Sequence, residues 1–350
     1  SLEPDAVCHA RGSGHRDPVH GAIRVGGGDG DDLIKGGKGN DRSFGGDGND
    51  YLIDTKGNNV MIGGAGDDAI KTGKGRDVLR GDDGNDFLFS GAGSDKIFAG
   101  EGDDVAYGGK GNDRIFGGDG DDALFGGKGH DRIFDGDGDD LLNGGRGNDK
   151  LFAHFGNDEL IGGKGNDRLM VRADGGEPII AHDPDAPLYY PDHPLDDADD
   201  TLDGGAGADT FFFRLDIDAT EEIARKHSDE NGVIDWQAVA GENNALHDHW
   251  VNGTGDDWIK DFDRSEGDRI VIKGHTVTAG VEQIDVDDDG VADYSLITLT
   301  SNQGGNGGAH DQDALGTIRV DGDLISEADL KVDRMVFIGA HETIDDLTVA

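Results

Sequence analysis

The sequence predicts an all-β protein in which a long repetitive solenoid precedes a second, β-rich C-terminal part. Three observations support this class. A nine-residue unit repeats without a gap from residue 27 to residue 170. Each unit ends in three residues that alternate outward, inward and outward, as a short strand does. All seven prolines lie outside this repeat, which is what a continuous ladder of backbone hydrogen bonds requires.

The repeat has the form Gly-Gly-x-Gly-x-Asp-x-aliphatic-x, and we number its positions one to nine. There are sixteen units: position four is glycine in all of them, and position six is aspartate in fifteen, with Asn59 as the exception. Position eight is a medium-sized aliphatic residue in fourteen, Ser43 and Ala106 being the weak ones. A merely solvated acidic surface would not hold one phase through sixteen units.

The composition is strongly acidic. The 350 residues include 31 basic and 75 acidic ones, which gives a formal net charge of -44, and only 34% are hydrophobic. A compact form therefore needs something that neutralises the acid. The charge argues against nucleic acid or an anionic membrane as the main partner. Cys8 is the only cysteine, so no internal disulfide forms, and no stretch is long and apolar enough for a transmembrane segment.

The loop chemistry favours calcium. Calcium is a hard cation that takes about six to eight oxygen ligands, both carboxylate and carbonyl. A glycine-rich turn exposes backbone carbonyls, and the phased aspartate beside it supplies the charge. Without metal, the stacked carboxylates of the position-six aspartates would repel one another. We therefore expect calcium binding and folding to be one event.

These motifs resemble the RTX (repeats-in-toxin, hemolysin-type) family, whose nonapeptide is a known calcium-binding repeat. The resemblance implies a right-handed parallel β-roll with two units per turn and calcium between stacked loops. Eight turns would make a rod of roughly 38 Å with at most about fourteen sites. The uncharged Asn59 would mark one weakened site. The implied ligands are the aspartates Asp32, Asp41, Asp50, Asp68, Asp77, Asp86, Asp95, Asp104, Asp113, Asp122, Asp131, Asp140, Asp149, Asp158 and Asp167, Asp209 in one further unit, and the loop glycines Gly28, Gly30, Gly37, Gly39, Gly109, Gly111, Gly118 and Gly120.

A finer period of eighteen predicts two unlike loop edges. Position three is basic in seven of eight alternate units, from Lys38 to Lys164, and acidic in six of the eight units between them. Position nine places Phe98, Phe116, Phe134 and Phe152 on one sheet, and Phe89, Tyr107 and Phe125 on the other. This asymmetry has two possible explanations. An eighteen-residue unit was duplicated and the asymmetry has no function, or the asymmetric surface is a contact face. Such a face would serve another copy, an upstream domain, or a polyanionic surface glycan along the lysine edge.

The predicted organisation has four parts. Residues 1–26 form an N-terminal extension or cap, 27–173 the roll, 174–201 a loop rich in proline and aspartate, and 202–350 the last repeat with a β-rich cap and a secretion-signal region. The segment Asp256–Ile272 resembles the closing segment of RTX proteins, including secreted metalloproteases of the serralysin type. That resemblance implies a cap for the roll and a type I secretion signal ending in the "IDDLTVA" of 344–350.

A second calcium motif is weaker. Asp285, Asp287, Asp289 and Asp293 around Gly290 match the first half of an EF-hand loop. Leu296 stands at the twelfth place, where that loop uses a bidentate glutamate. A separate calcium site and a plain acidic turn between strands both remain open.

No catalytic motif is found. His341-Glu342 is followed by Asp345 where a zinc-protease helix needs its second histidine, and no nucleophile elbow occurs. We therefore expect a non-catalytic module that the bacterial type I secretion machinery exports and that folds on extracellular calcium. Two alternatives stay open: a self-assembling or adhesive surface protein that acts as a homo-oligomer, and the C-terminal part of a larger secreted hydrolase, epimerase or toxin.

Overall fold

The computed structural model describes residues 24–172, 199–215, 256–274, 277–286, 290–301 and 314–334. The chain divides into two compact units. The first contains Ser1–Met170, Asp200–Phe211 and Lys260–Asp268, and the second contains Val171–Asp199, Phe212–Ile259 and Arg269–Ala350. Most of the predicted N-terminal extension, the loop residues 174–198, the secretion-signal residues 344–350, and Asp287 and Asp289 lie outside the described residues.

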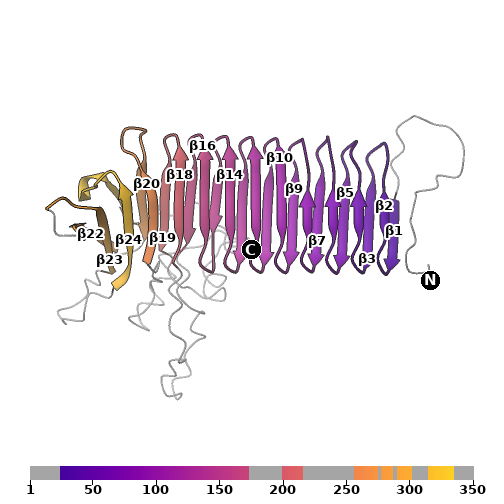
Figure 1. Ribbon diagram of the computed structural model, residues 1–350, viewed down its shortest axis with the longest axis horizontal. Coiled ribbons are helices and arrows are strands. Elements are labelled where there is room, and N and C mark those ends of the chain that lie inside the picture. Colours follow the sequence, from indigo (N-terminus) through magenta and orange to yellow (C-terminus); the bar gives the residue numbers. More distant parts are fainter. Residues whose placement is uncertain are drawn as a thin grey trace, which may run out of the picture. The chain divides into compact units, whose positions relative to one another are not determined.

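The repeat forms a parallel β-roll, as the sequence predicts (Figure 1). Odd-numbered strands from β1 to β17 follow one another in one sheet, and even-numbered strands from β2 to β18 follow one another in the other. The strands are β1 (Arg24–Asp29), β2 (Leu33–Lys35), β3 (Arg42–Asp47), β4 (Tyr51–Ile53), β5 (Val60–Ala65), β6 (Ala69–Lys71), β7 (Val78–Asp83), β8 (Phe87–Phe89), β9 (Lys96–Glu101), β10 (Val105–Lys110), β11 (Arg114–Asp119), β12 (Ala123–Lys128), β13 (Arg132–Asp137), β14 (Leu141–Arg146), β15 (Lys150–Ala153), β16 (Glu159–Lys164), β17 (Arg168–Arg172), β18 (Thr201–Ala206) and β19 (Thr210–Leu215).

The register repeats every eighteen residues. Ile115 of β11 pairs with Ile97 of β9 and with Ile133 of β13, and all three strands are parallel. Two nonapeptides therefore make one turn, which brings every repeat position onto its equivalent in the next turn. After the loop, β18 continues the ladder directly on β16, with Leu202 opposite Leu160.

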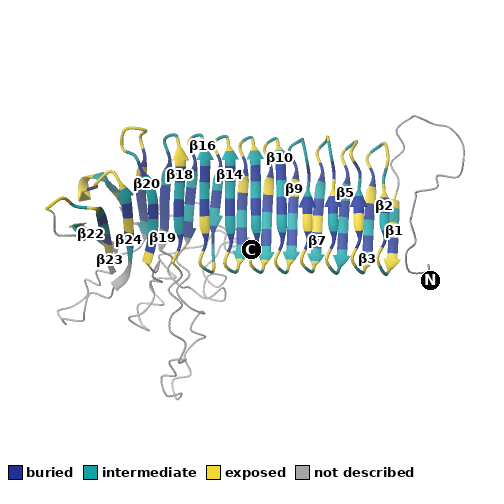
Figure 2. Cartoon of the chain, in the orientation of Figure 1, coloured by how far each residue is buried: buried dark blue, intermediate teal, exposed yellow. Residues whose placement is uncertain are grey.

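Position eight fills the space between the two sheets. Its side chains are fully buried, from Ile34 to Leu169, and the alternation of buried and outward residues follows each strand (Figure 2). Ala106 and Ser43, the weak positions of the sequence pattern, occupy equivalent buried places at 0% and 1% exposure. The aliphatic core is therefore a single row per sheet, which is thin for a domain of this size.

Aromatic rings stack along the outside of both sheets. Phe98, Phe116 and Phe134 follow one another at centroid distances of 5.0 and 4.9 Å, with planes within 6° of parallel. On the other sheet Tyr107 stacks on Phe125 at 4.7 Å, whereas Phe89 and Tyr107 are tilted at 6.5 Å. The predicted stacks are thus confirmed for these rings, with a looser contact at Phe89.

The second unit is also β-rich. β22 (Val277–Ile284), β23 (Tyr294–Ser301) and β24 (Ala314–Gly322) form an antiparallel sheet, and β21 (Arg269–Gly274) pairs in parallel with β25 (Leu330–Arg334). Ile297, Leu299 and Ile318 are fully buried there. The remaining elements are β20 (Asp256–Phe262) and the short 3-10 helix η1 (Glu327–Asp329).

Candidate calcium sites

The position-six aspartates form two continuous ladders inside the loops of the roll. All fifteen, and Asp209, are at most 6% exposed. In each ladder the backbone N–H of one residue donates to Oδ1 of its equivalent one turn further along. The donor–acceptor distance is 2.7 Å from Asp50 to Asp68 and 2.8 Å from Asp113 to Asp131. From Asp50 onward, one carboxylate oxygen of each ladder aspartate therefore holds the stack together.

The second carboxylate oxygen has no such partner. Oδ2 is buried and accepts no hydrogen bond in the residues Asp50, Asp68, Asp77, Asp86, Asp95, Asp104, Asp113, Asp122, Asp131, Asp140, Asp149, Asp158, Asp167 and Asp209. A buried, unpaired carboxylate oxygen is costly, and buried charges are normally paired or bound to a metal. The same kind of atom is left over in loop after loop, which indicates a ligand of the same kind in each.

Glycine at position one makes room for that oxygen. A Cβ on Gly126 would lie 2.6 Å from Oδ2 of Asp131, in its own loop, and 2.9 Å from the carbonyl oxygen of Gly144, one turn on. Both distances are shorter than real Cβ contacts, so only glycine leaves this space open. A carboxylate oxygen and a carbonyl oxygen thus meet at one small cradle, and oxygen donors of these two kinds suit calcium.

The predicted loop glycines all have left-handed backbone conformations. Their φ angles lie between 92° and 135° for Gly28, Gly30, Gly37, Gly39, Gly109, Gly111, Gly118 and Gly120. At Gly111 the reason is also steric, because a Cβ there would overlap the carbonyl oxygen of Gly93 in the preceding turn. The close stacking of backbone on backbone at such a place therefore depends on glycine.

Burial raises the pKa of ladder aspartates such as Asp122 and Asp131, and neighbouring carboxylates in the ladder add to the effect, against the backbone N–H groups that lower it. The pKa rises to about 7 for Asp68, Asp113, Asp122, Asp131 and Asp209, to about 8 for Asp86 and Asp140, and to about 6 for Asp95, Asp104 and Asp167. Without a cation, the folded roll therefore favours protonated carboxyl groups. A bound divalent ion reverses that preference and keeps them ionised.

A second hydrogen-bond ladder, which the sequence did not predict, joins the residues at position five of successive turns. There the N–H group donates in the opposite direction, to a side chain one turn earlier. Examples are Asn85 to Asp67 at 3.0 Å and Asn148 to Nδ1 of His130 at 2.8 Å. The signal was the frequent Asn or Asp at position five. Ser94 and His130 also act as acceptors in this ladder. The ladder therefore has no single residue type that would identify it in the sequence.

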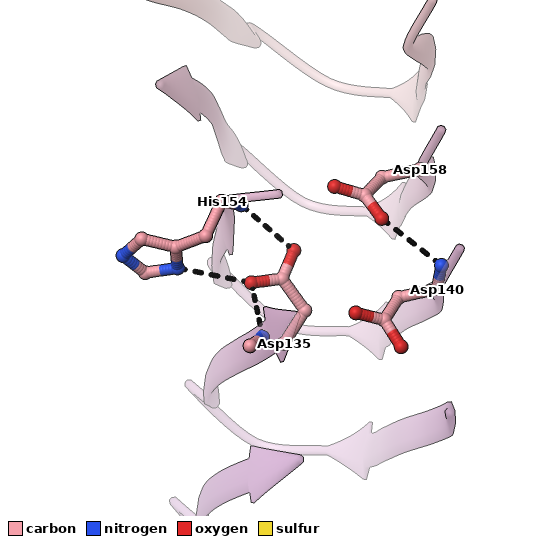
Figure 3. A network of polar contacts seen from close by, with 5 residues as sticks. Asp135, Asp140, His154 and Asp158 are labelled. Atoms are coloured by element: carbon pink, nitrogen blue, oxygen red, sulfur yellow. Dashed lines mark hydrogen bonds and ion pairs between the residues drawn. The ribbon is translucent and has the colours of Figure 1, made fainter. Parts of the chain in front are cut away.

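Two further buried aspartates, Asp54 and Asp135, lie at position one, and the sequence did not predict them as ligands. Asp135 lies in β13 and faces Asp140 and Asp158, as Figure 3 shows. One oxygen from each of these three carboxylates lies within 4.8 Å of the others, so the group has a spacing that suits one metal ion. Asp135 is held by His154, whose Nδ1 is 3.0 Å from Oδ1 and whose backbone N–H donates to Oδ2 at 3.1 Å.

The last loop of the roll is closed by acidic side chains from 260–268. Asp261 accepts hydrogen bonds from the backbone N–H groups of Gly204 and Gly205, at 2.9 and 2.6 Å. Asp268 accepts the N–H of Asp209 at 2.9 Å, in the place of the next ladder residue. These carboxylates satisfy donors that the end of a stack would leave without partners.

Asp200 is a ladder residue that the sequence placed in the loop 174–201. Its Oδ1 accepts the N–H of Asp158 at 2.9 Å, as a position-six aspartate does. The signal was present in the sequence, because Asp200 precedes Thr201 and Leu202 with the spacing of a repeat end. Because the nine-residue phase is lost after Met170, the repeat pattern alone did not assign Asp200 to the ladder.

The two charged edges are confirmed by the strand register. Lys110, Lys128 and Arg146 are paired in successive turns on one edge. Glu101, Asp119 and Asp137 are paired in successive turns on the other. Each edge therefore brings like charges together at the spacing of neighbouring strands.

The described residues of the acidic segment, 285, 286 and 290–293, lie between β22 and β23 in the second unit. Asp285 accepts the N–H of Gly290 at 2.8 Å, and Asp293 accepts the N–H of Val286 at 2.7 Å. Both carboxylates thus accept backbone hydrogen bonds within the segment, while Oδ1 of Asp285 is buried without a hydrogen bond. A calcium site here stays a prediction, since Asp287 and Asp289 lie outside the described residues.

Comparison with known proteins identifies the repeat. The family model for the RTX calcium-binding nonapeptide repeat (4 copies) matches 27–52, 44–79, 62–97, 71–106, 98–133, 134–169 and 196–218. A search of curated proteins found no match. The matches cover the roll and its last repeat; the similarity of 256–272 to serralysin-type proteins stays a prediction. In the described part of the chain, no helix has the length and apolar character needed to cross a membrane.

Proposed function

Because this chain is an RTX β-roll protein with calcium-binding repeats, we propose that it is a secreted module whose folding is switched on by extracellular calcium. The row of buried Oδ2 atoms without hydrogen bonds carries this proposal. In the folded roll those atoms need either protons or cations. Calcium would supply the missing charge at every loop, using the carboxylates and the loop carbonyls as ligands.

The thin aliphatic core supports coupled binding and folding. Single rows of side chains such as Ile115 and Leu124 bury little apolar surface for each ordered residue. Stacked carboxylates repel one another when ionised, and the formal net charge of -44 adds repulsion along the whole chain. Binding to the folded state alone then stabilises it in proportion to the logarithm of the calcium concentration at each site.

This coupling suits export. In the cytoplasm, where free calcium is scarce, the chain would stay unfolded and pass through a type I secretion channel. Outside the cell, calcium would fold it from the end that residues 260–268 close. The module itself would be non-catalytic, since its regularly spaced acids would be committed to the metal. An export assay with and without residues 344–350 tests the secretion part, because loss of export is expected only if the signal lies there.

A calcium titration of metal-free protein tests the folding part. Far-ultraviolet circular dichroism should show a steep change from coil to β structure with calcium and little change with magnesium, which dehydrates reluctantly and demands octahedral geometry. A β signal that is already complete in chelator at neutral pH would contradict the proposal.

A further inference from the structure

The exceptional ladder residue Asn59 keeps the hydrogen bonds of an aspartate but not its charge. Its Oδ1 accepts the N–H of Asp41 at 3.0 Å, and its own N–H donates to Oδ1 of Asp77 at 2.7 Å. Its Nδ2 is buried and has no hydrogen-bond acceptor. An amide N–H₂ group therefore stands where every other unit has the second carboxylate oxygen, and such a group cannot bind a cation.

The same loop begins with an unusual residue. Asp54 occupies position one, where ten of the sixteen units have glycine. Its side chain is buried, at 2% exposure for the residue. Oδ1 accepts the N–H of Lys56 at 3.1 Å, whereas Oδ2 is buried and accepts no hydrogen bond. The loop that lacks a carboxylate at position six thus has one at position one.

The carboxylate of Asp54 lies in the cradle of the neighbouring loop. At Gly45 and Gly63 an added Cβ would overlap Oδ2 of the position-six aspartate of the same unit. At Gly36 it would instead overlap Oδ2 of Asp54, and Cγ of Asp54 would lie 2.8 Å away. Asp54 therefore reaches back one turn and occupies the place that a ladder carboxylate has elsewhere.

Asp41 is the position-six aspartate of that neighbouring loop, and its carboxyl group lies close enough to interact directly with the carboxyl group of Asp54. Two facing carboxylates that are both ionised repel each other, so the pair needs a bridging cation or a shared proton. A calcium ion bridges such oxygens readily.

We propose that Asp54 is the calcium ligand that replaces the carboxylate missing at Asn59, so that Asp41 and Asp54 together hold a calcium ion between the loops 36–41 and 54–59. This inference rests on the proposed calcium-binding function of the roll. It changes the expectation for this place in the array, because Asn59 alone predicts a weakened site. The loop 54–59 keeps one carboxylate, at position one (Asp54) and not at position six (Asn59).

Asp135 provides the comparison, as the other aspartate at position one of the sixteen units. Its own unit keeps the ladder carboxylate, Asp140, and its oxygens accept hydrogen bonds from Gly136 and His154. The position-one aspartate in a complete loop thus has backbone and imidazole partners for both oxygens. Asp54, in the incomplete loop, keeps one oxygen without a hydrogen bond, as a ligand would.

The test counts bound calcium ions per chain by equilibrium dialysis of the full chain, with folding followed by circular dichroism. The variants are Asp54→Asn, Asn59→Asp and the double variant Asp54→Gly with Asn59→Asp, which restores the common loop. Asp119→Asn removes one exposed charge from the acidic edge and serves as the charge control. Asp50→Asn removes a carboxylate from an ordinary ladder place and tests the proposed function itself.

We expect Asp54→Asn to lose one calcium ion per chain, or to weaken that ion by about tenfold or more, since the number of charged ligands tunes calcium affinity. The double variant should recover the wild-type count, and Asp119→Asn should keep it. If Asp54→Asn fails to fold, the double variant still decides, because a count above the wild-type value would show that the wild-type loop held no ion at Asp54 and would overturn the inference.

The two possible failures are distinguishable. An unchanged count in Asp54→Asn, together with a lost ion in Asp50→Asn, overturns the role of Asp54 and leaves the calcium function intact. A wild-type chain that binds no calcium overturns the function and, with it, the inference.

Discussion

The backbone N–H of Asp122 donates a hydrogen bond of 2.6 Å to Oδ1 of Asp140, the equivalent residue one turn further along the roll. Oδ2 of the same Asp140 is buried and accepts no hydrogen bond. From Asp50 onward, each ladder aspartate therefore divides its two oxygens between two tasks. One oxygen aligns the turns, and the other is available to a cation.

This division predicts different results for two substitutions of Asp122. Asp122→Asn keeps an oxygen for the N–H of Asp104, which donates to it at 2.8 Å, but loses the charge. Its calcium midpoint should rise while the roll still forms in excess calcium. Asp122→Ala also leaves that buried N–H without an acceptor, which costs about 1–3 kcal/mol more. Thermal unfolding in saturating calcium measures the difference, and equal stabilities would contradict the two-task account.

The raised pKa values predict that acid replaces calcium in part. The pKa of Asp122 rises from 3.8 to about 7 in the folded roll, chiefly through burial. The folded state then binds more protons than the unfolded one between these values, so its stability increases as the pH falls through about 7 and is fully present below 3.8. In chelator, the β signal should therefore grow on acidification from neutral pH.

Calcium should show the opposite pH dependence, because protons compete with it for the same carboxylates. The calcium midpoint should rise as the pH falls through about 7, the raised pKa of Asp122 and Asp131. Titrations at a series of pH values measure this midpoint. A midpoint that stays constant across the series would show that the buried carboxyl groups are not the ligands.

The loop glycines predict a sharp steric contrast. Gly111→Ala would place a Cβ onto the backbone of Gly93 at a φ of 134°. We expect a loss of about 1–3 kcal/mol in the free energy of unfolding, the usual cost of such backbone strain. Gly26→Ala is the matched control, since nothing lies within 4 Å of a Cβ there. Denaturant unfolding in calcium compares the two, and similar losses would contradict the close stacking of loops.

The aromatic stack predicts a contribution that does not depend on the metal. Phe116 lies between Phe98 and Phe134, at 5.0 and 4.9 Å. Phe116→Ala should lower stability by about 1–3 kcal/mol through two ring pairs, with little change in the number of bound calcium ions. Phe155→Ala, at a residue that is 49% exposed, should have a much smaller effect. A calcium count that falls in Phe116→Ala would show that the stack and the loops are not independent.

Much of the roll followed from the sequence because its signals are local and repeated. Position eight alternates with outward residues, and the eighteen-residue period places Lys110 beside Lys128 without any further information. The repeat also predicted the left-handed glycines, such as Gly118 with a φ of 135°. In a solenoid, the register of one turn fixes the register of the others, so one correct assignment extends to the whole array.

What the sequence did not predict depends on where side chains point. The ladder at position five uses Asn, Asp, Ser94 and His130 as acceptors, which have little in common except a lone pair. Asp54 lies in a variable position whose burial becomes visible only when the loops are stacked. Asp200 lies beyond a break in the repeat, and only its hydrogen bond to Asp158 shows that it belongs to the ladder.

The most direct test of this account is a crystal structure of the protein grown in calcium, with anomalous data to identify the ions. We expect calcium between successive loops, with Oδ2 of residues such as Asp113 and Asp131 about 2.3–2.6 Å from the ion. We also expect an ion beside Asp54. A folded roll whose loops hold no ion at saturating calcium, with Oδ2 bonded only to protein groups or water, would contradict this account.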